Sequence, residues 1–215
     1  MEPEEDSFLQ YMKTCMLKNY NNLRKSIMLI ENKGIKTSTF YIPPFELNVG
    51  EFVVIYLHNG YHFYKTEMFL KDIFCGKTKN ENVIVHKEMT FVEHFRESAF
   101  RNLFYPVTVE EYLRKNANMA SPFATKIYDT EWINKKTKVQ NLGGNPRHLL
   151  SLYSTLSKTD HIILDVVGQG LEGSIEIYKI VNEVVKNGGS AILLDNFNDM
   201  KDKCTKYIEL QWINE

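Results

Sequence analysis

Short, continuous apolar runs recur along this chain, separated by polar and turn-forming residues. The clearest are Phe52–Leu57, Ile162–Val167 and Ala191–Leu194, in which nearly every position is apolar. Strands buried on both faces have this pattern, because neither set of alternating side chains meets water. Further strands are predicted at 26–31, 39–42, 82–86, 90–92 and 207–210.

Helical spacing fills much of the chain around these strands. Amphipathic helices are predicted over 8–24 and 67–74, and a mixed, mostly helical stretch over about 96–140. Another helix is expected to begin at Asn145-Pro146, with asparagine as N-cap and proline at the first helical position.

The last predicted helix has the most regular apolar stripe. Its stripe residues are Ile177, Ile180, Val181, Val184 and Val185, and it is expected to end at Asn187-Gly188-Gly189. Strands that alternate with helices predict an α/β fold with a parallel or mixed sheet.

Composition narrows the function classes. Among 215 residues, 26 Lys and Arg oppose 27 Asp and Glu, so no basic excess points to nucleic acid. The apolar runs are too short to span a bilayer, and the acidic start lacks the features of a signal peptide. Cys15, Cys75 and Cys204 are scattered, which indicates reduced packing cysteines in the cytoplasm. The Lys-, Asn- and Ile-rich usage indicates an AT-rich, bacterial genome.

Two segments carry the most specific pattern. Asn141-Leu-Gly-Gly-Asn-Pro-Arg147 precedes a helical segment, and His161-Ile-Ile-Leu-Asp165 follows as an apolar strand that ends in aspartate. This order and spacing resemble an ATP-binding cassette (ABC) ATPase, in which an LSGGQ-type signature precedes the Walker B strand. The resemblance covers about residues 26 to 212. It implies an ABC-ATPase-like P-loop NTPase fold, a mixed β-sheet flanked by helices.

On this resemblance the chain divides into two parts. Residues 1–25 form an N-terminal helical extension that the common cassette core lacks, and residues 26–215 form the ABC ATPase-like domain. Within that domain, a helical subdomain carrying the signature is expected over about 95–157.

The resemblance also implies that the residues of ATP hydrolysis have been replaced. The replaced positions are Phe63 and Tyr64 (P-loop lysine and Ser/Thr), His94 (Q-loop glutamine), Leu142 (signature serine), Val166 (catalytic glutamate) and Phe197 (switch histidine). Loss of a positioned general base alone costs about 10²–10⁴ in rate. We therefore expect no catalytic residues and no hydrolysis.

The loop after Phe52–Leu57 lacks the bare glycines that let backbone amides close around phosphate. Tyr61, His62, Phe63 and Tyr64 stand there instead. We expect these four side chains to fill the phosphate site.

Three functions follow as alternatives. The first is a pseudo-ATPase that serves as a structural or regulatory partner in a membrane transport complex, with no cofactor. The second is a switch that holds ATP or ADP with magnesium, without turnover, through Gly60, Lys65, Thr66 and Asp165. The third is an unrelated α/β enzyme that uses scattered histidines: His58, His62, His86, His94 or His161. Because no two of these have paired metal-ligand spacing, no metal site is expected.

Leu103–Leu113 resembles the run that follows the Q-loop in the family and faces the membrane subunit there. Phe104, Tyr105, Pro106 and Tyr112 are therefore candidate interface anchors, since aromatic residues are enriched at such sites. The alternative is that these residues belong to the buried core. Thr108 and Glu111 also have the spacing of a capping box.

The resemblance implies partners as well. They are a membrane permease subunit, a second ABC ATPase subunit in a homodimer or heterodimer, or both. The expected location is the cytoplasm, peripheral at the inner face of the cell membrane through a partner.

Overall fold

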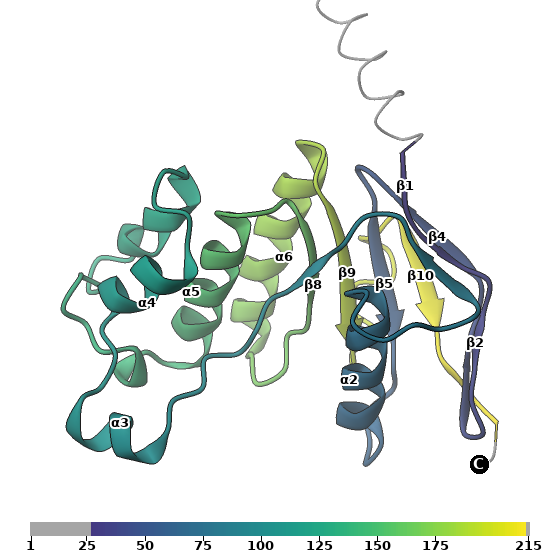
Figure 1. Cartoon of the computed structure of the whole chain (residues 1–215), viewed down its shortest axis with the longest axis horizontal. Helices are drawn as coiled ribbons and strands as arrows, with labels where there is room; N and C mark the ends of the chain where they lie inside the picture. Colours follow the sequence, from purple (N-terminus) through teal and green to yellow (C-terminus); the bar gives the residue numbers. More distant parts are fainter. Residues whose placement is uncertain (1–26, 214–215) are drawn as a thin grey trace, which may run out of the picture.

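The computed structural model describes residues 27–213, so the predicted helix over 8–24 and Cys15 lie outside the described residues. Its centre is a five-stranded parallel sheet in the order β10-β5-β9-β8-β7 (Figure 1). The strands are β5 (Phe52–Tyr56), β7 (Thr90–Phe91), β8 (His161–Leu164), β9 (Ser190–Asp195) and β10 (Lys206–Glu209).

This sheet is buried on both faces, as the continuous apolar runs predict. Phe52 and Val54 of β5 pack with α6 (Leu171–Lys186) and α5 (Gly144–Leu156). Val53 and Ile55 point to the other face and pack with α2 (Phe63–Phe74). The sheet therefore separates two apolar cores, and its side-chain alternation fixes which helix covers which face.

Two small antiparallel sheets extend the second core. One has the order β4-β1-β6 and the other β11-β3-β2. Their strands are β1 (Met28–Asn32), β2 (Ile35–Lys36), β3 (Phe40–Ile42), β4 (Phe45–Asn48), β6 (Val83–Val85) and β11 (Gln211–Trp212). β3 ends immediately before Pro43, in keeping with the missing amide hydrogen of proline. Cys75 and Cys204 are free thiols.

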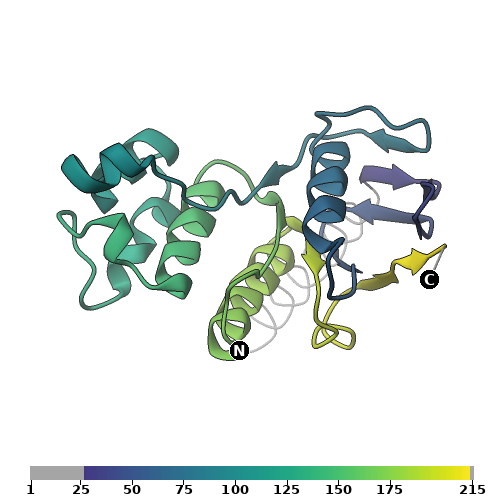
Figure 2. The same ribbon diagram turned by 90° about the horizontal axis from the view of Figure 1, so that it is seen from below.

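Between β7 and β8 the chain forms a region that we call the helical lobe. It comprises α3 (Ala99–Phe104), α4 (Val109–Asn116), η1 (Pro122–Asp129), η2 (Val139–Asn141) and α5. Figure 2 shows this lobe at one side of the molecule and the antiparallel strands at the other, with α6 between them. No helix within residues 27–213 is long and apolar enough to cross a membrane.

Two predicted helix starts were wrong. α2 begins at Phe63 instead of residue 67, because Phe63 is buried and continues the stripe of Leu70 and Phe74 toward the N-terminus. α5 begins at Gly144 with Gly143 as N-cap, and the Asn145 side chain donates to Glu176 instead of capping. Proline is tolerated at residue 146 because the first turn of a helix needs no intrahelical amide donors.

The predicted capping box at the start of α4 is present. The Thr108 hydroxyl accepts from the Glu111 amide at 3.2 Å, and Glu111 Oε2 accepts from the Thr108 amide at 2.8 Å. We expect Thr108→Ala to lower the free energy of unfolding by about 1 kcal/mol, because an N-terminal amide of α4 loses its acceptor. Thr108→Ser, which keeps the hydroxyl, should remain close to wild type in urea denaturation. Equal stability of the alanine variant and wild type would contradict the role of this cap.

Candidate functional site

The carboxyl ends of the parallel strands bring distant segments to one edge of the sheet. The loop into α2 follows β5, Glu93 and His94 follow β7, and Asp165 follows β8. In open α/β sheets this edge is where ligands bind. The candidate site is therefore built where these segments meet.

Asp165 is the centre of the site. Its side chain is 1% exposed and accepts a hydrogen bond from the Val167 amide at 2.8 Å. The His94 Nε2 atom lies 2.9 Å and 2.8 Å from its two carboxylate oxygens. Burial opposes ionisation, but the His94 and Val167 hydrogen bonds outweigh it and lower the pKa of Asp165. The same contact with Asp165 raises the pKa of His94.

A second histidine, His148, stands beside this pair. It lies in the first turns of α5, and its ring centroid is 5.3 Å from that of His94. Its side chain is buried, and neither ring nitrogen has a hydrogen-bond partner among the described residues. Burial lowers the pKa of His148 to about 4, so the imidazole is neutral at neutral pH. His94, His148 and Asp165 each offer one ligand atom, and these atoms lie within 4.8 Å of one another.

The α2 side of the site adds a second carboxyl group. Burial, and then the neighbouring charge of Asp165, raise the pKa of Glu67 to about 9. Glu67 is therefore protonated at neutral pH, and its Oε1 atom has no hydrogen-bond partner within the described part of the chain. Lys71, one turn further along α2, is buried and forms an ion pair with Glu93 at 2.7 Å.

The predicted filling of the phosphate loop by four side chains was wrong in part. Phe63 is buried, but Tyr61 is 95% exposed and Tyr64 is 57% exposed. The side chain of Tyr61 therefore fills nothing, since it points into solvent. Tyr64 lines a cavity of about 340 Å³ beside Asp165.

The residues predicted to hold a nucleotide, and the loop that carries them, do not fit a magnesium-bound nucleotide. Phe63, an apolar side chain, opens α2 where a phosphate needs a cation. Lys65 is exposed, and neither Lys65 nor Thr66 lines the cavity beside Asp165. The lysine that α2 does place at this cavity is Lys71, which is paired with Glu93. Gly60 keeps a positive φ of 150°, but the loop around it offers no lysine toward Asp165.

Three further positions, at which hydrolysis residues were predicted to be replaced, are Leu142, Val166 and Phe197. Leu142 and Val166 are buried apolar residues, whereas Phe197 is 52% exposed. Gly144 lies against the segment after Asp165, since a Cβ on this residue would come within 3.3 Å of the Gly168 carbonyl oxygen. Gly143, the other glycine of the pair, has no neighbour within 4 Å of a Cβ added to it.

The other histidines do not join the site. His58 pairs with the Leu210 carbonyl oxygen at 2.9 Å, and the His62 ring lies 5.7 Å from that of Trp212. His86 is exposed, and His161 is buried at the start of β8. Only His94 of the predicted histidines therefore reaches Asp165. His148 and Glu67, which come from α5 and α2, were not predicted as site residues.

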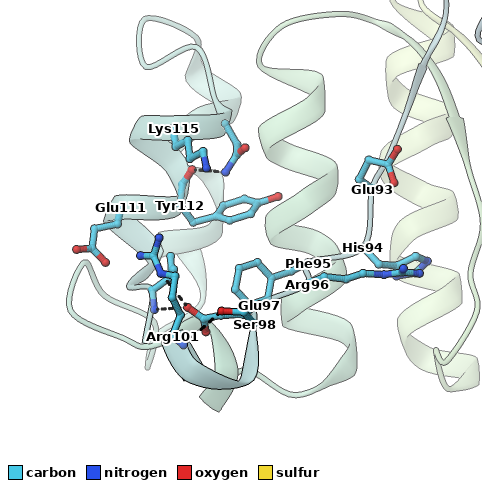
Figure 3. A pocket seen from close by; sticks show the side chains of 12 residues that line it. Glu93, His94, Phe95, Arg96, Glu97, Ser98, Arg101, Glu111, Tyr112 and Lys115 are labelled. Atoms are coloured by element: carbon cyan, nitrogen blue, oxygen red, sulfur yellow. Dashed lines mark hydrogen bonds and ion pairs between the residues drawn. The ribbon is translucent and has the colours of Figure 1, made fainter. Parts of the chain in front are cut away.

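A cavity of about 570 Å³ opens beside the segment that follows His94 (Figure 3). Phe95 and Tyr112 face each other there, with ring centroids 5.7 Å apart, and His94 points away from α4. The Tyr112 hydroxyl is 3.2 Å from that of Ser151, so this predicted interface residue is partly buried.

The other predicted interface aromatics face solvent. Phe104 is 60% exposed and Tyr105 is 71% exposed, and Pro106 is half-buried. The alternative that places Phe104 and Tyr105 in the core was wrong.

Among the comparisons with known proteins, only the comparison of structures finds similar proteins. No protein-family description matches the sequence, and no curated protein matches it either. Many solved structures share the fold. One is described as a metal-chelate type ABC transporter in an inward-facing conformation, 16% identical, covering 86% of this chain and 79% of that one, with a TM-score of 0.64.

Two other similar structures come from different assemblies. One is cbiO1 of Clostridium perfringens, part of the cbiONQ transporter complex, 15% identical over 86% of both chains, with a TM-score of 0.58. The other is the archaeal ribosome recycling factor aABCE1, 17% identical over 86% of this chain and 38% of that one, with a TM-score of 0.55. The predicted fold is confirmed: the chain has the fold of the ATP-binding cassette ATPases.

Proposed function

We propose that this chain is a non-hydrolysing ABC-type subunit that serves as a structural or regulatory partner in a membrane transport complex or one derived from it. The observation that carries the proposal is an exposed apolar patch on α3, which we call the α3 patch. Its residues are Phe100, Leu103, Phe104 and Tyr105, with exposed fractions of 66%, 74%, 60% and 71%. Contiguous exposed apolar side chains of this kind mark interaction surfaces.

The surroundings of the α3 patch support a docking role. The cavity of about 570 Å³ beside it is lined by charged side chains, including Arg96, Arg101 and Lys115. The half-buried rings of Phe95 and Tyr112 pack against each other and also line this cavity. Apolar anchors next to a charged rim are the usual composition of a protein interface. We assign this surface to a membrane permease subunit, with the chain peripheral at the inner face of the membrane.

The absence of hydrolysis is the second half of the proposal. Val166, which directly follows Asp165, is a buried apolar residue and cannot take a proton from water. Glu67 is the nearest further carboxyl group, but it is protonated at neutral pH. Loss of a general base costs about 10²–10⁴ in rate, and loss of the phosphate-binding lysine removes charge stabilisation as well.

Purified protein is expected to release no phosphate from Mg-ATP above the rate of an Asp165→Asn control. The physical reason is the missing base and the missing lysine described above. The measurement is steady-state phosphate release at millimolar ATP. Turnover that the Asp165→Asn variant abolishes would contradict the assignment as a pseudo-ATPase.

Nucleotide binding without turnover has its own test. A ligand at 100 times its Kd adds about 2.7 kcal/mol to stability. We expect 1 mM Mg-ATP or Mg-ADP to leave the thermal unfolding midpoint unchanged, since neither Lys65 nor Thr66 lines the cavity at Asp165. A clear upward shift that Lys65→Ala removes would instead favour the nucleotide-binding switch.

Substitutions in the α3 patch should impair docking without impairing folding. We expect Phe104→Ala with Tyr105→Ala to abolish co-purification with the membrane complex, while circular dichroism and the thermal midpoint stay close to wild type. Both side chains are mostly exposed, so their removal leaves no core cavity. Trp132→Ala, an aromatic residue that is 53% exposed, is the matched control. Retained co-purification of the folded double variant would remove this surface from the proposal.

A further inference from the structure

We propose that His94, His148 and Asp165 form a binding site for a divalent transition-metal ion of the zinc class, which binds without nucleotide. The three ligand atoms come from three separate segments and lie within 4.8 Å of one another. His94 follows β7, His148 lies in α5, and Asp165 follows β8.

The unpaired state of His148 is the observation that points to a ligand. Its side chain is 4% exposed, and neither ring nitrogen has a partner among residues 27–213. A buried polar group without a hydrogen bond costs about 1–3 kcal/mol, so such groups are nearly always paired. His94 and Asp165 each offer a ligand atom within 4.8 Å of one on His148, and a metal ion held by all three would give one His148 ring nitrogen a partner.

A metal would draw in the widest pair of ligand atoms, which lie within 4.8 Å of each other, by up to about 1.4 Å and would push one close pair apart. In a tetrahedral zinc site with bonds of about 2.0–2.2 Å, ligand atoms stand roughly 3.4 Å apart. His94 Nε2 lies 2.8 Å from Asp165 Oδ2, so these two atoms would separate by roughly half an ångström. His94 is 38% exposed, which gives its side chain room to move and a metal a route to the site.

The ligand chemistry selects the class of metal. Two imidazoles and one carboxylate suit zinc and its neighbours, whereas magnesium and calcium prefer oxygen ligands alone. A further position is open to water from a cavity of about 270 Å³ lined by His94, His148 and Gln169. Because the site is built from this chain's own side chains, the ion would bind without a nucleotide.

The location gives the ion a structural task. His148 belongs to the helical lobe, whereas Asp165 belongs to the edge of the parallel sheet. His94 lies on the segment that leads to Ser98, the N-cap of α3. One ion would therefore fix the helical lobe to the sheet and hold the start of the segment that carries the α3 patch.

The test uses full-length protein without an affinity tag, stripped of metal with a chelator and then titrated with ZnCl₂ by calorimetry. We expect one equivalent to bind in the absence of nucleotide and to raise the thermal midpoint. Co²⁺ should give the visible absorption of a nitrogen- and oxygen-ligated site without a thiolate charge-transfer band. His148→Leu should weaken Zn²⁺ binding by more than the roughly 10–100-fold typical of losing a supporting partner.

The leucine variant is chosen because the His148 nitrogens make no hydrogen bonds, so its fold should survive without metal. His86→Ala, which removes an exposed histidine, is the control and should bind Zn²⁺ like wild type. Failure of wild type to bind Zn²⁺, unchanged affinity in folded His148→Leu, a thiolate band with Co²⁺, or binding only with ATP present would each overturn the proposal. Phosphate release and membrane co-purification are separate measurements, so this site can fail while the proposed function stands.

Discussion

A buried carboxylate at the end of β8 constrains the edge of the sheet at which the parallel strands end. Removing such a charge from water costs on the order of several kcal/mol unless it is paired. Hydrogen bonds from the Val167 amide and from His94 to Asp165 offset this cost. Because His94 stands on the only segment that joins β7 to the helical lobe, the pairing also fixes where that lobe begins. The pairing is therefore one of the contacts that hold the start of the helical lobe against the sheet.

Much of the fold could be predicted because its strands are buried on both faces. Phe52–Tyr56, His161–Leu164 and Ser190–Asp195 are mostly apolar runs of strand length, shorter than a typical buried helix. Local chemistry also sufficed for the capping box at Thr108. The start of α2 was missed because its first turn contains Tyr64 and Lys65, which carry no helical stripe of their own.

The site could be predicted only in part, because its residues come together through topology. His94 and Asp165 were singled out by motif position, yet nothing local in the sequence shows that they bond to each other. His148 is followed by leucines in α5, and Glu67 is one of several polar residues of α2, so neither stands out in the sequence as a site residue. Only the folded arrangement of β7, β8 and the two helices makes neighbours of them.

The α3 patch has a practical consequence for work with this protein. Three large apolar side chains on a six-residue helix, with Tyr105 at its C-cap, give copies of the chain a surface through which to associate when no partner covers it. Expression of the chain alone therefore favours inclusion bodies and soluble aggregates at high concentration. Production together with its partner, or in mild detergent that shields the aromatic rings, should keep it monodisperse.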